Sequence, residues 1–384
     1  MSLSSRAIFD PSRPRIDSAP RRYDETSFDF YDRCSEPVIS AVRDKLEEWF
    51  AAFPAGHARR DLLGRLRDGD SRQFHSAVWE LYIHESLRRQ QFRVAPNPKL
   101  THTTRRVDFL ATRGDERVYV ECTVVSHSDT DAKERSAIGR LEAAIDASGI
   151  TDYWLDLDFG QRGRAPINPE PFVTALREWI GTLDRDHVES TVHQGRNSLP
   201  HFEWREGDWI TQVWAIPRGP DLRGRTDVRP LGILPGEDLD GELWLAARAK
   251  LELKAEAYGN LNAPYIIALD APEAWPDEEQ LAWAVLGPGA FTTWWQRDGF
   301  LLRPGGPSYE GVSGVLMGIT IQPHSFPRQV PTLYENPDAR RPVPDSVNWN
   351  RVRVRDGSPL HVSGRPVHEA FEVDEGWPGV PWPK

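Results

Sequence analysis

Hydrophobic positions spaced by about one helical turn predict a helix over residues 72–90. Such spacing is typical of an amphipathic helix, with one apolar face packed on a core and the other face polar. Two carboxylates, Glu80 and Glu85, lie on this segment. The apolar positions that carry the pattern are Phe74, Val78, Leu81 and Leu87.

Three extended segments are expected after this helix. The first, residues 92–95, stops at a Pro-Asn-Pro sequence that is typical of a turn. The next two, residues 106–112 and 117–125, are separated by Gly114-Asp115, which favours a β-hairpin. The expected order is therefore helix, strand, strand, strand.

Two carboxylates fall inside the hairpin strands. Alternation along residues 117–125 predicts an apolar face, while Glu121 shares the other face with Tyr119 and Thr123. A charged carboxylate inside a core strand is costly unless it has a partner, and Asp108 raises the same problem on the neighbouring strand. A shared Mg²⁺ would solve both problems. The alternative is that both acids lie at strand ends and form ordinary ion pairs with nearby arginines: Arg105, Arg106 or Arg117.

These residues resemble the PD-(D/E)xK nuclease superfamily, which has the restriction-endonuclease-like fold. In that family a helix carries a Glu, and a hairpin then carries an Asp and a Glu-x-Lys. The matching positions here are Glu80, Asp108 and Glu121, with Thr123 at the lysine position, and the resemblance spans residues 71–127 of the 384. Val107 replaces the usual proline, whose position concerns the backbone only. Thr123 replaces the family's lysine and offers a hydroxyl without charge.

The resemblance implies an α/β fold and a metal-dependent reaction. Asp108 and Glu121 would hold Mg²⁺ or Mn²⁺, with the backbone carbonyl of Cys122 as a further ligand. Glu80 would bind a second metal or a metal-bound water. The missing lysine would have to come from elsewhere in the chain, or the site would be slow or inactive.

Residues 241–270 contain a candidate replacement for that lysine. Their apolar stripe predicts a helix that ends at Gly259, and a strand is expected after Pro264. Lys254 lies on the stripe, although the whole chain has only six lysines. In the family the lysine is sometimes displaced onto a helix behind the motif strand, so Lys254 is the candidate. The alternative is a lysine that extends to solvent from the edge of the stripe.

The resemblance and the expected elements together divide the chain into four segments. Residues 1–38 are expected to be an extended arm and residues 39–70 a helical lead-in. Residues 71–325 would form a restriction-endonuclease-like core of helix, three strands, helix and strand, with a large insertion at about 126–240. The Pro-rich residues 326–384 would be a tail that wraps the core. The competing option closes the core directly with residues 131–158.

Composition limits the kinds of protein this can be. The chain has 58 acidic and 47 basic residues, a formal net charge of -11, which argues against indiscriminate nucleic-acid binding. Residues 71–113 nevertheless carry eight basic and three acidic residues, a local charge of +5 that suits a polyanion. With two cysteines and no apolar run of membrane-spanning length, the sequence predicts a cytoplasmic protein without membrane contact.

The function predicted from these features is that of an endonuclease, a Mg²⁺- or Mn²⁺-dependent hydrolase of DNA phosphodiester bonds. Restriction, repair and phage defence are all compatible with it. The site residues are Glu80, Asp108, Glu121, Thr123 and Lys254, with Arg105 and Arg106 as nucleic-acid contacts. The alternative is a catalytically silent protein of the same fold that binds nucleic acid or a protein partner. A protein partner or a homo-oligomer is compatible with both.

Overall fold

The computed structural model divides the chain into two compact units. Unit 1 consists of Met1–Pro20, Thr26–His127 and Asp240–Lys384, and unit 2 of Arg21–Glu25 and Ser128–Leu239. The residues that the structure describes are 7–125, 130–163, 167–192, 198–232, 243–271, 278–292, 295–303, 305, 309–355 and 358–379.

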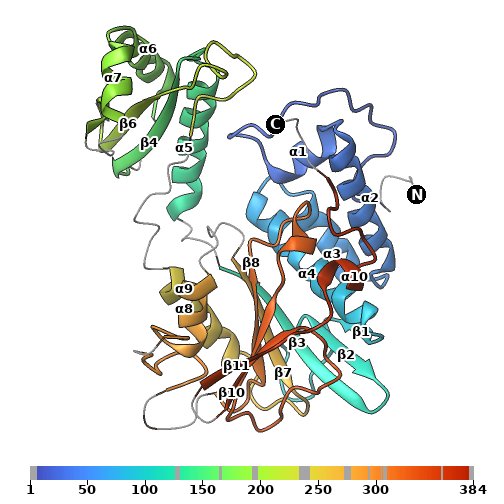
Figure 1. Ribbon diagram of the computed structural model, residues 1–384. Helices are drawn as coiled ribbons and strands as arrows, with labels where there is room; N and C mark the ends of the chain where they lie inside the picture. Colours follow the sequence, from blue (N-terminus) through green and yellow to red (C-terminus); the bar gives the residue numbers. More distant parts are fainter. Residues whose placement is uncertain are drawn as a thin grey trace. The chain divides into compact units, whose positions relative to one another are not determined.

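Unit 1 is a mixed sheet with helices on both faces, which confirms the expected α/β class (Figure 1). The helices in its described residues are α1 (Ser27–Arg33), α2 (Pro37–Ala52), α3 (His57–Leu66), α4 (Ser71–Arg89), α8 (Leu243–Ala255), α9 (Glu278–Leu286), the 3-10 helix η4 (Phe326–Arg328) and α10 (Val367–Ala370). Its strands are β1 (Arg93–Pro96), β2 (Phe109–Arg113), β3 (Glu116–Val124), β7 (Tyr265–Ala271), β8 (Gly314–Ile319), β9 (Thr332–Glu335), β10 (Asn350–Arg355) and β11 (Ser358–Val362).

The strands lie in the order β1-β2-β3-β7-β8-β9-β10-β11. Strands β1, β2 and β3 are antiparallel neighbours, whereas β7 joins β3 in parallel, with Glu121 opposite Ile267. Strand β7 therefore extends the β2–β3 hairpin. The observed sheet agrees with the option in which α8 and β7, and not residues 131–158, complete the core.

Two hydrophobic clusters occupy the two faces of this sheet. Helices α1 to α4 contribute to the first cluster, and α8 and α9 contribute to the second (Figure 1). Strand β3 divides its side chains between them: Val118 and Val120 belong to the first cluster, and Tyr119 belongs to the second. The alternation expected for residues 117–125 is confirmed, but helices cover both faces. Glu121, on the Tyr119 face, is consequently turned toward α8.

Helix α4 is buried along most of its length. The expectation that one face of this helix would be polar and exposed is therefore wrong. It packs against α2 and α3 and also against β1 and β3. The indole of Trp79 donates a hydrogen bond to the carbonyl of Ala268 (2.9 Å), and Ser86 accepts one from the indole of Trp349 (2.8 Å). Polar side chains on this helix therefore need partners inside the protein.

The described part of the N-terminal 38 residues is packed rather than extended away from the core. Ile8 and Phe9 are buried, and helix α1 places the ring of Tyr31 against that of Phe74. The buried Arg43 guanidinium donates to two main-chain carbonyls of this segment. The aromatic residues among its prolines and arginines supply enough apolar surface to fix the segment.

The C-terminal segment 326–384 adds three strands to the sheet instead of only wrapping the core. Strand β9 pairs with β8, and β10 and β11 continue the sheet from it. Phe326 and Phe371 contribute rings to an aromatic cluster with Trp49 and Tyr82. Prolines lie mainly between these elements, where no ladder hydrogen bond is lost.

Unit 2 has its own sheet and its own hydrophobic cluster. Strand β6 is central between β4 and β5, and β5 and β6 form a hairpin that turns at Gly207, whose φ is positive. The unit covers most of the range expected as an insertion. Its elements are α5 (Thr130–Asp146), β4 (Tyr153–Gln161), α6 (Pro169–Gly181), α7 (Arg185–Thr191), β5 (His201–Glu206) and β6 (Trp209–Pro217). Within the described parts of both units, no helix has the length and apolar character needed to cross a membrane.

Candidate active site on the β2–β3 hairpin

Asp108 and Glu121 lie next to each other at the start of β2 and the middle of β3. The backbone N–H of Asp108 donates to Oε2 of Glu121 (3.2 Å), and the N–H of Cys122 donates to Oδ2 of Asp108 (2.8 Å). Asp108 was expected inside a strand but directly precedes β2, because its N–H is directed to a carboxylate and not to the sheet ladder. The hairpin therefore brings the two acids together.

Lys254 of helix α8 forms an ion pair with Glu121. Its Nζ donates to Oε1 of Glu121 at 2.5 Å, and the side chains are 28% and 4% exposed respectively. Burial alone would lower the pKa of Lys254, but the charges of Glu121 and Asp108 outweigh burial and raise it. The lysine therefore stays protonated at neutral pH. Lys254 is thus paired with a carboxylate instead of extending freely to solvent, while its role as a replacement for the motif lysine stays a prediction.

Glu80 of helix α4 is held by an arginine that sequence reasoning missed. Arg65 of α3 donates from Nη1 and Nη2 to the two oxygens of Glu80 (2.6 and 2.7 Å), and from Nε to Asp61 (3.1 Å). Burial raises the pKa of Glu80, which Arg65 opposes and the charges of Asp61 and Glu121 reinforce. Nothing in the spacing of residues 65 and 80 marks them as partners, because the contact depends on how α3 packs on α4.

Negative charge accumulates around Asp108. Burial raises the pKa of Asp108 well above its usual value, and the neighbouring Glu121 and Glu80 raise it further. The N–H of Cys122 and the ammonium of Lys254 offset only part of this. A positive charge placed beside Asp108 would relieve this repulsion.

The three carboxylates do not form a three-ligand metal set. Within the described residues, no group of three or more His, Cys, Asp or Glu side chains is arranged to hold a metal ion. The observed arrangement is the pair Asp108 and Glu121 with Lys254, while Glu80 is bound by Arg65. A divalent ion here would therefore rest on two carboxylates.

Thr123 and Cys122 follow Glu121 on β3, and both are buried. Thr123 is buried two residues after Glu121, on the same face of β3, and pairs with Leu269 of β7. Burial raises the pKa of the Cys122 thiol well above its usual value, so it is a poor nucleophile. Tyr258, also missed by sequence reasoning, donates from its hydroxyl to the carbonyl of Arg106 (3.1 Å), and burial raises its pKa.

Arg105 and Arg106, which are predicted to contact nucleic acid, form hydrogen bonds to different parts of the chain. Arg105 donates from Nη1 to the carbonyl of Ala257, just after α8 (3.1 Å). Arg106 donates from Nη1 to the carbonyl of Asn97, in the turn between β1 and β2 (3.3 Å). Both side chains are exposed, and Arg106 lines the larger of the two cavities described next.

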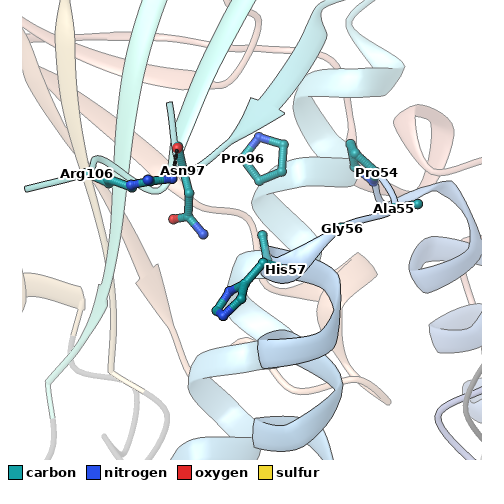
Figure 2. A pocket seen from close by; sticks show the side chains of 8 residues that line it. Pro54, Ala55, Gly56, His57, Pro96, Asn97 and Arg106 are labelled. Atoms are coloured by element: carbon teal, nitrogen blue, oxygen red, sulfur yellow. Dashed lines mark hydrogen bonds between the residues drawn. The ribbon is translucent and has the colours of Figure 1, made fainter. Parts of the chain in front are cut away.

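Two adjoining cavities lie near this site, and the smaller one reaches Glu80 and Asp108, whereas Glu121 and Lys254 line neither. The smaller cavity, of about 210 Å³, is lined by polar groups that include Arg65, Glu80 and Asp108. The larger cavity, of about 730 Å³, lies between the turn that starts α3 and the turn after β1 (Figure 2). Both cavities share the same three lining residues: Ala58, Pro96 and Asn97.

Comparison of the chain with known proteins found no relative. No protein-family model, no curated protein and no solved structure matches the chain.

Proposed function

We propose that the protein is a metal-dependent nuclease that hydrolyses DNA phosphodiester bonds, built on a restriction-endonuclease-like core. Within unit 1 the order α4, β1, β2, β3, α8, β7, interrupted between β3 and α8 by unit 2, supports the proposal, because it has the helix, three strands, helix and strand implied by the resemblance. The Lys254–Glu121 ion pair beside Asp108 is the observation that carries it. A lysine from a second element supplies the charge that Thr123 lacks.

The donor chemistry fits a hard divalent cation. Mg²⁺ prefers carboxylate oxygens and is commonly bound by one or two carboxylates, with waters and substrate phosphate completing its shell. Asp108 and Glu121 would hold the ion, and a cation beside them would offset the burial and the repulsion from Glu121 and Glu80 that together raise the pKa of Asp108. When bound, such an ion lowers the pKa of a water and neutralises charge on a phosphate.

The side chains of the chain then have separate roles. Lys254 is charged at neutral pH, because the carboxylates raise its pKa more than burial lowers it, so it acts as a cation and not as a base. It orients the attacking water and stabilises negative charge that develops on the phosphate. Arg65 also lines the smaller cavity, but its guanidinium is paired with Glu80 and Asp61, so its role is to hold the Glu80 carboxylate in place.

Glu80 gives a specific reason to keep the alternative function in view. Its carboxylate is already neutralised by Arg65, so it is not an open ligand for a second ion. This observation favours either a site with one metal ion or a catalytically silent protein of the same fold that binds nucleic acid. The two functions differ in whether DNA is cut.

The test is divalent-dependent cleavage of end-labelled DNA by the full chain with Mn²⁺ or Mg²⁺. Asp108→Asn and Glu121→Gln should each lower the cleavage rate at least about a hundredfold, because each removes a carboxylate from the ion. Glu116→Gln is the matched control, since Glu116 is on the same hairpin but pairs with Arg113 at the surface. Cleavage at the wild-type rate in either site variant would overturn the proposal.

A further inference from the structure

The larger cavity has two facing walls built from segments distant in the sequence. One wall is the turn 54–58, which leads into α3, and the other contains Pro96, Asn97 and Arg106 (Figure 2). Its volume of about 730 Å³ lies in the range of sites for small organic molecules. The cavity is thus of a size for one nucleotide and not for a double helix.

The chemistry of the walls suits a nucleotide. Two prolines and the ring of His57 offer flat surfaces against which a base or sugar can pack. Asn97 adds an amide group that can pair with a base edge, and the exposed guanidinium of Arg106 suits a phosphate. The first turn of α3, which begins after Gly56 with no side-chain cap, also borders the cavity and favours an anion.

The cavity continues the proposed active site. Because the smaller cavity contains Glu80 and Asp108 and shares Ala58, Pro96 and Asn97 with the larger one, a strand with its phosphate at Asp108 would enter the larger cavity next. A base in a duplex has to leave the stack to enter such a space.

We infer that the larger cavity binds one unpaired nucleotide next to the scissile phosphate, so that the substrate is single-stranded DNA. The inference rests on the proposed function and adds its substrate class. Arg106 and His57 are the residues that hold this nucleotide.

The test measures binding separately from cleavage. The full chain, in a chelator that removes divalent ions, is titrated into an end-labelled oligodeoxythymidine and into a labelled blunt duplex of equal length. Fluorescence anisotropy should give binding of the single strand at least about tenfold tighter than binding of the duplex. Arg106→Ala and His57→Ala should each weaken single-strand binding by about tenfold.

Arg117→Ala is the matched control. Arg117 is an exposed arginine on β3 that does not line the cavity. Its removal should leave single-strand affinity within about twofold of wild type, as expected for a residue outside the site. Equal losses from Arg117→Ala and Arg106→Ala, or duplex binding as tight as single-strand binding, would overturn the inference.

Cleavage assays separate this inference from the proposed function. Cutting of DNA without a single-strand preference leaves the nuclease proposal in place and overturns the cavity assignment. Arg106-dependent binding of the single strand without cutting supports the cavity assignment and overturns the proposed hydrolysis.

Discussion

Glu121 is a buried carboxylate whose counter-ion comes from another element. Removing two charges from water costs free energy that their mutual attraction only partly returns, so such a pair is seldom a source of stability. Lys254 keeps part of its surface in solvent, whereas Glu121 is nearly inaccessible. The pair is therefore better explained by the chemistry of the site than by the stability of the fold.

Removal of Lys254 alone should destabilise the protein. Lys254→Met leaves Glu121 buried without its cation, and we expect the free energy of unfolding at neutral pH to fall by about 2 kcal/mol. Glu121→Gln added to this variant removes the unpaired charge and should restore most of the loss. Urea unfolding of the two variants and the wild type measures both effects. An equal loss in the single and double variants would contradict the pairing.

Residues differ in how far the sequence reveals their partners. Lys254 could be predicted because a lysine on an apolar stripe has to find a partner or reach water, and few lysines compete for the role. Arg65 could not, because α3 has an ordinary distribution of charges and its contact with Glu80 is a product of helix packing. Charge pairs between elements are set by geometry that only the folded chain supplies.

At the scale of elements, strand β7 carries another buried acid, Asp270, on the sheet face opposite that of Glu121. Burial raises the pKa of Asp270 to about 7, although the backbone N–H groups of Ile321 and Ala271 oppose the shift. Because the folded pKa lies above the ordinary value of 3.8, the folded state binds the proton more tightly than the unfolded state. Asp270 therefore lowers stability as pH rises from about 4 to about 7.

Asp270→Asn should flatten this dependence. The wild-type free energy of unfolding should fall by up to about 4 kcal/mol more than that of the variant over this pH window, from about 1.4 kcal/mol per pKa unit. Urea unfolding at pH 4, 5.5 and 8 measures the difference. Asp115→Asn, at the exposed hairpin tip, is the control. Identical pH profiles for wild type and Asp270→Asn would show that folding does not raise the pKa of Asp270.

Elements with a regular spacing of apolar residues could be predicted from the sequence. Elements whose order depends on packing against distant segments of the chain could not. Alternation and a Gly-Asp turn gave the β2–β3 hairpin, and the stripe of residues 241–258 gave α8. Helix α4 was assigned a polar face that it lacks, because the N-terminal helices cover the side away from the sheet. Strands β9 to β11 were missed because their short segments lie among prolines, and only pairing with β8 orders them.

At the scale of the whole molecule, each unit has a hydrophobic cluster of its own. Each also contains an acid whose pKa burial raises to about 7: the buried Asp270 in unit 1 and the partly buried Glu142 of α5 in unit 2. Above that pH both acids are charged and each lowers the stability of its own unit. Neutral variants can therefore report on the two units separately.

We expect calorimetry at pH 8 to resolve two unfolding transitions. Asp270→Asn should raise the midpoint of one transition, and Glu142→Gln should raise the midpoint of the other, because each variant removes a buried charge from one unit only. A single transition that both variants shift equally would mean that the chain unfolds as one cooperative body.

One rate tests whether Lys254 supplies the charge that Thr123 lacks in a nuclease site. The single-turnover rate of Mn²⁺-dependent cleavage of single-stranded DNA is compared in wild type, Lys254→Met and Lys254→Met with Thr123→Lys. We predict a loss of about 10²- to 10⁴-fold in Lys254→Met and substantial recovery when lysine is placed at position 123. Cleavage by Lys254→Met at the wild-type rate would contradict the account.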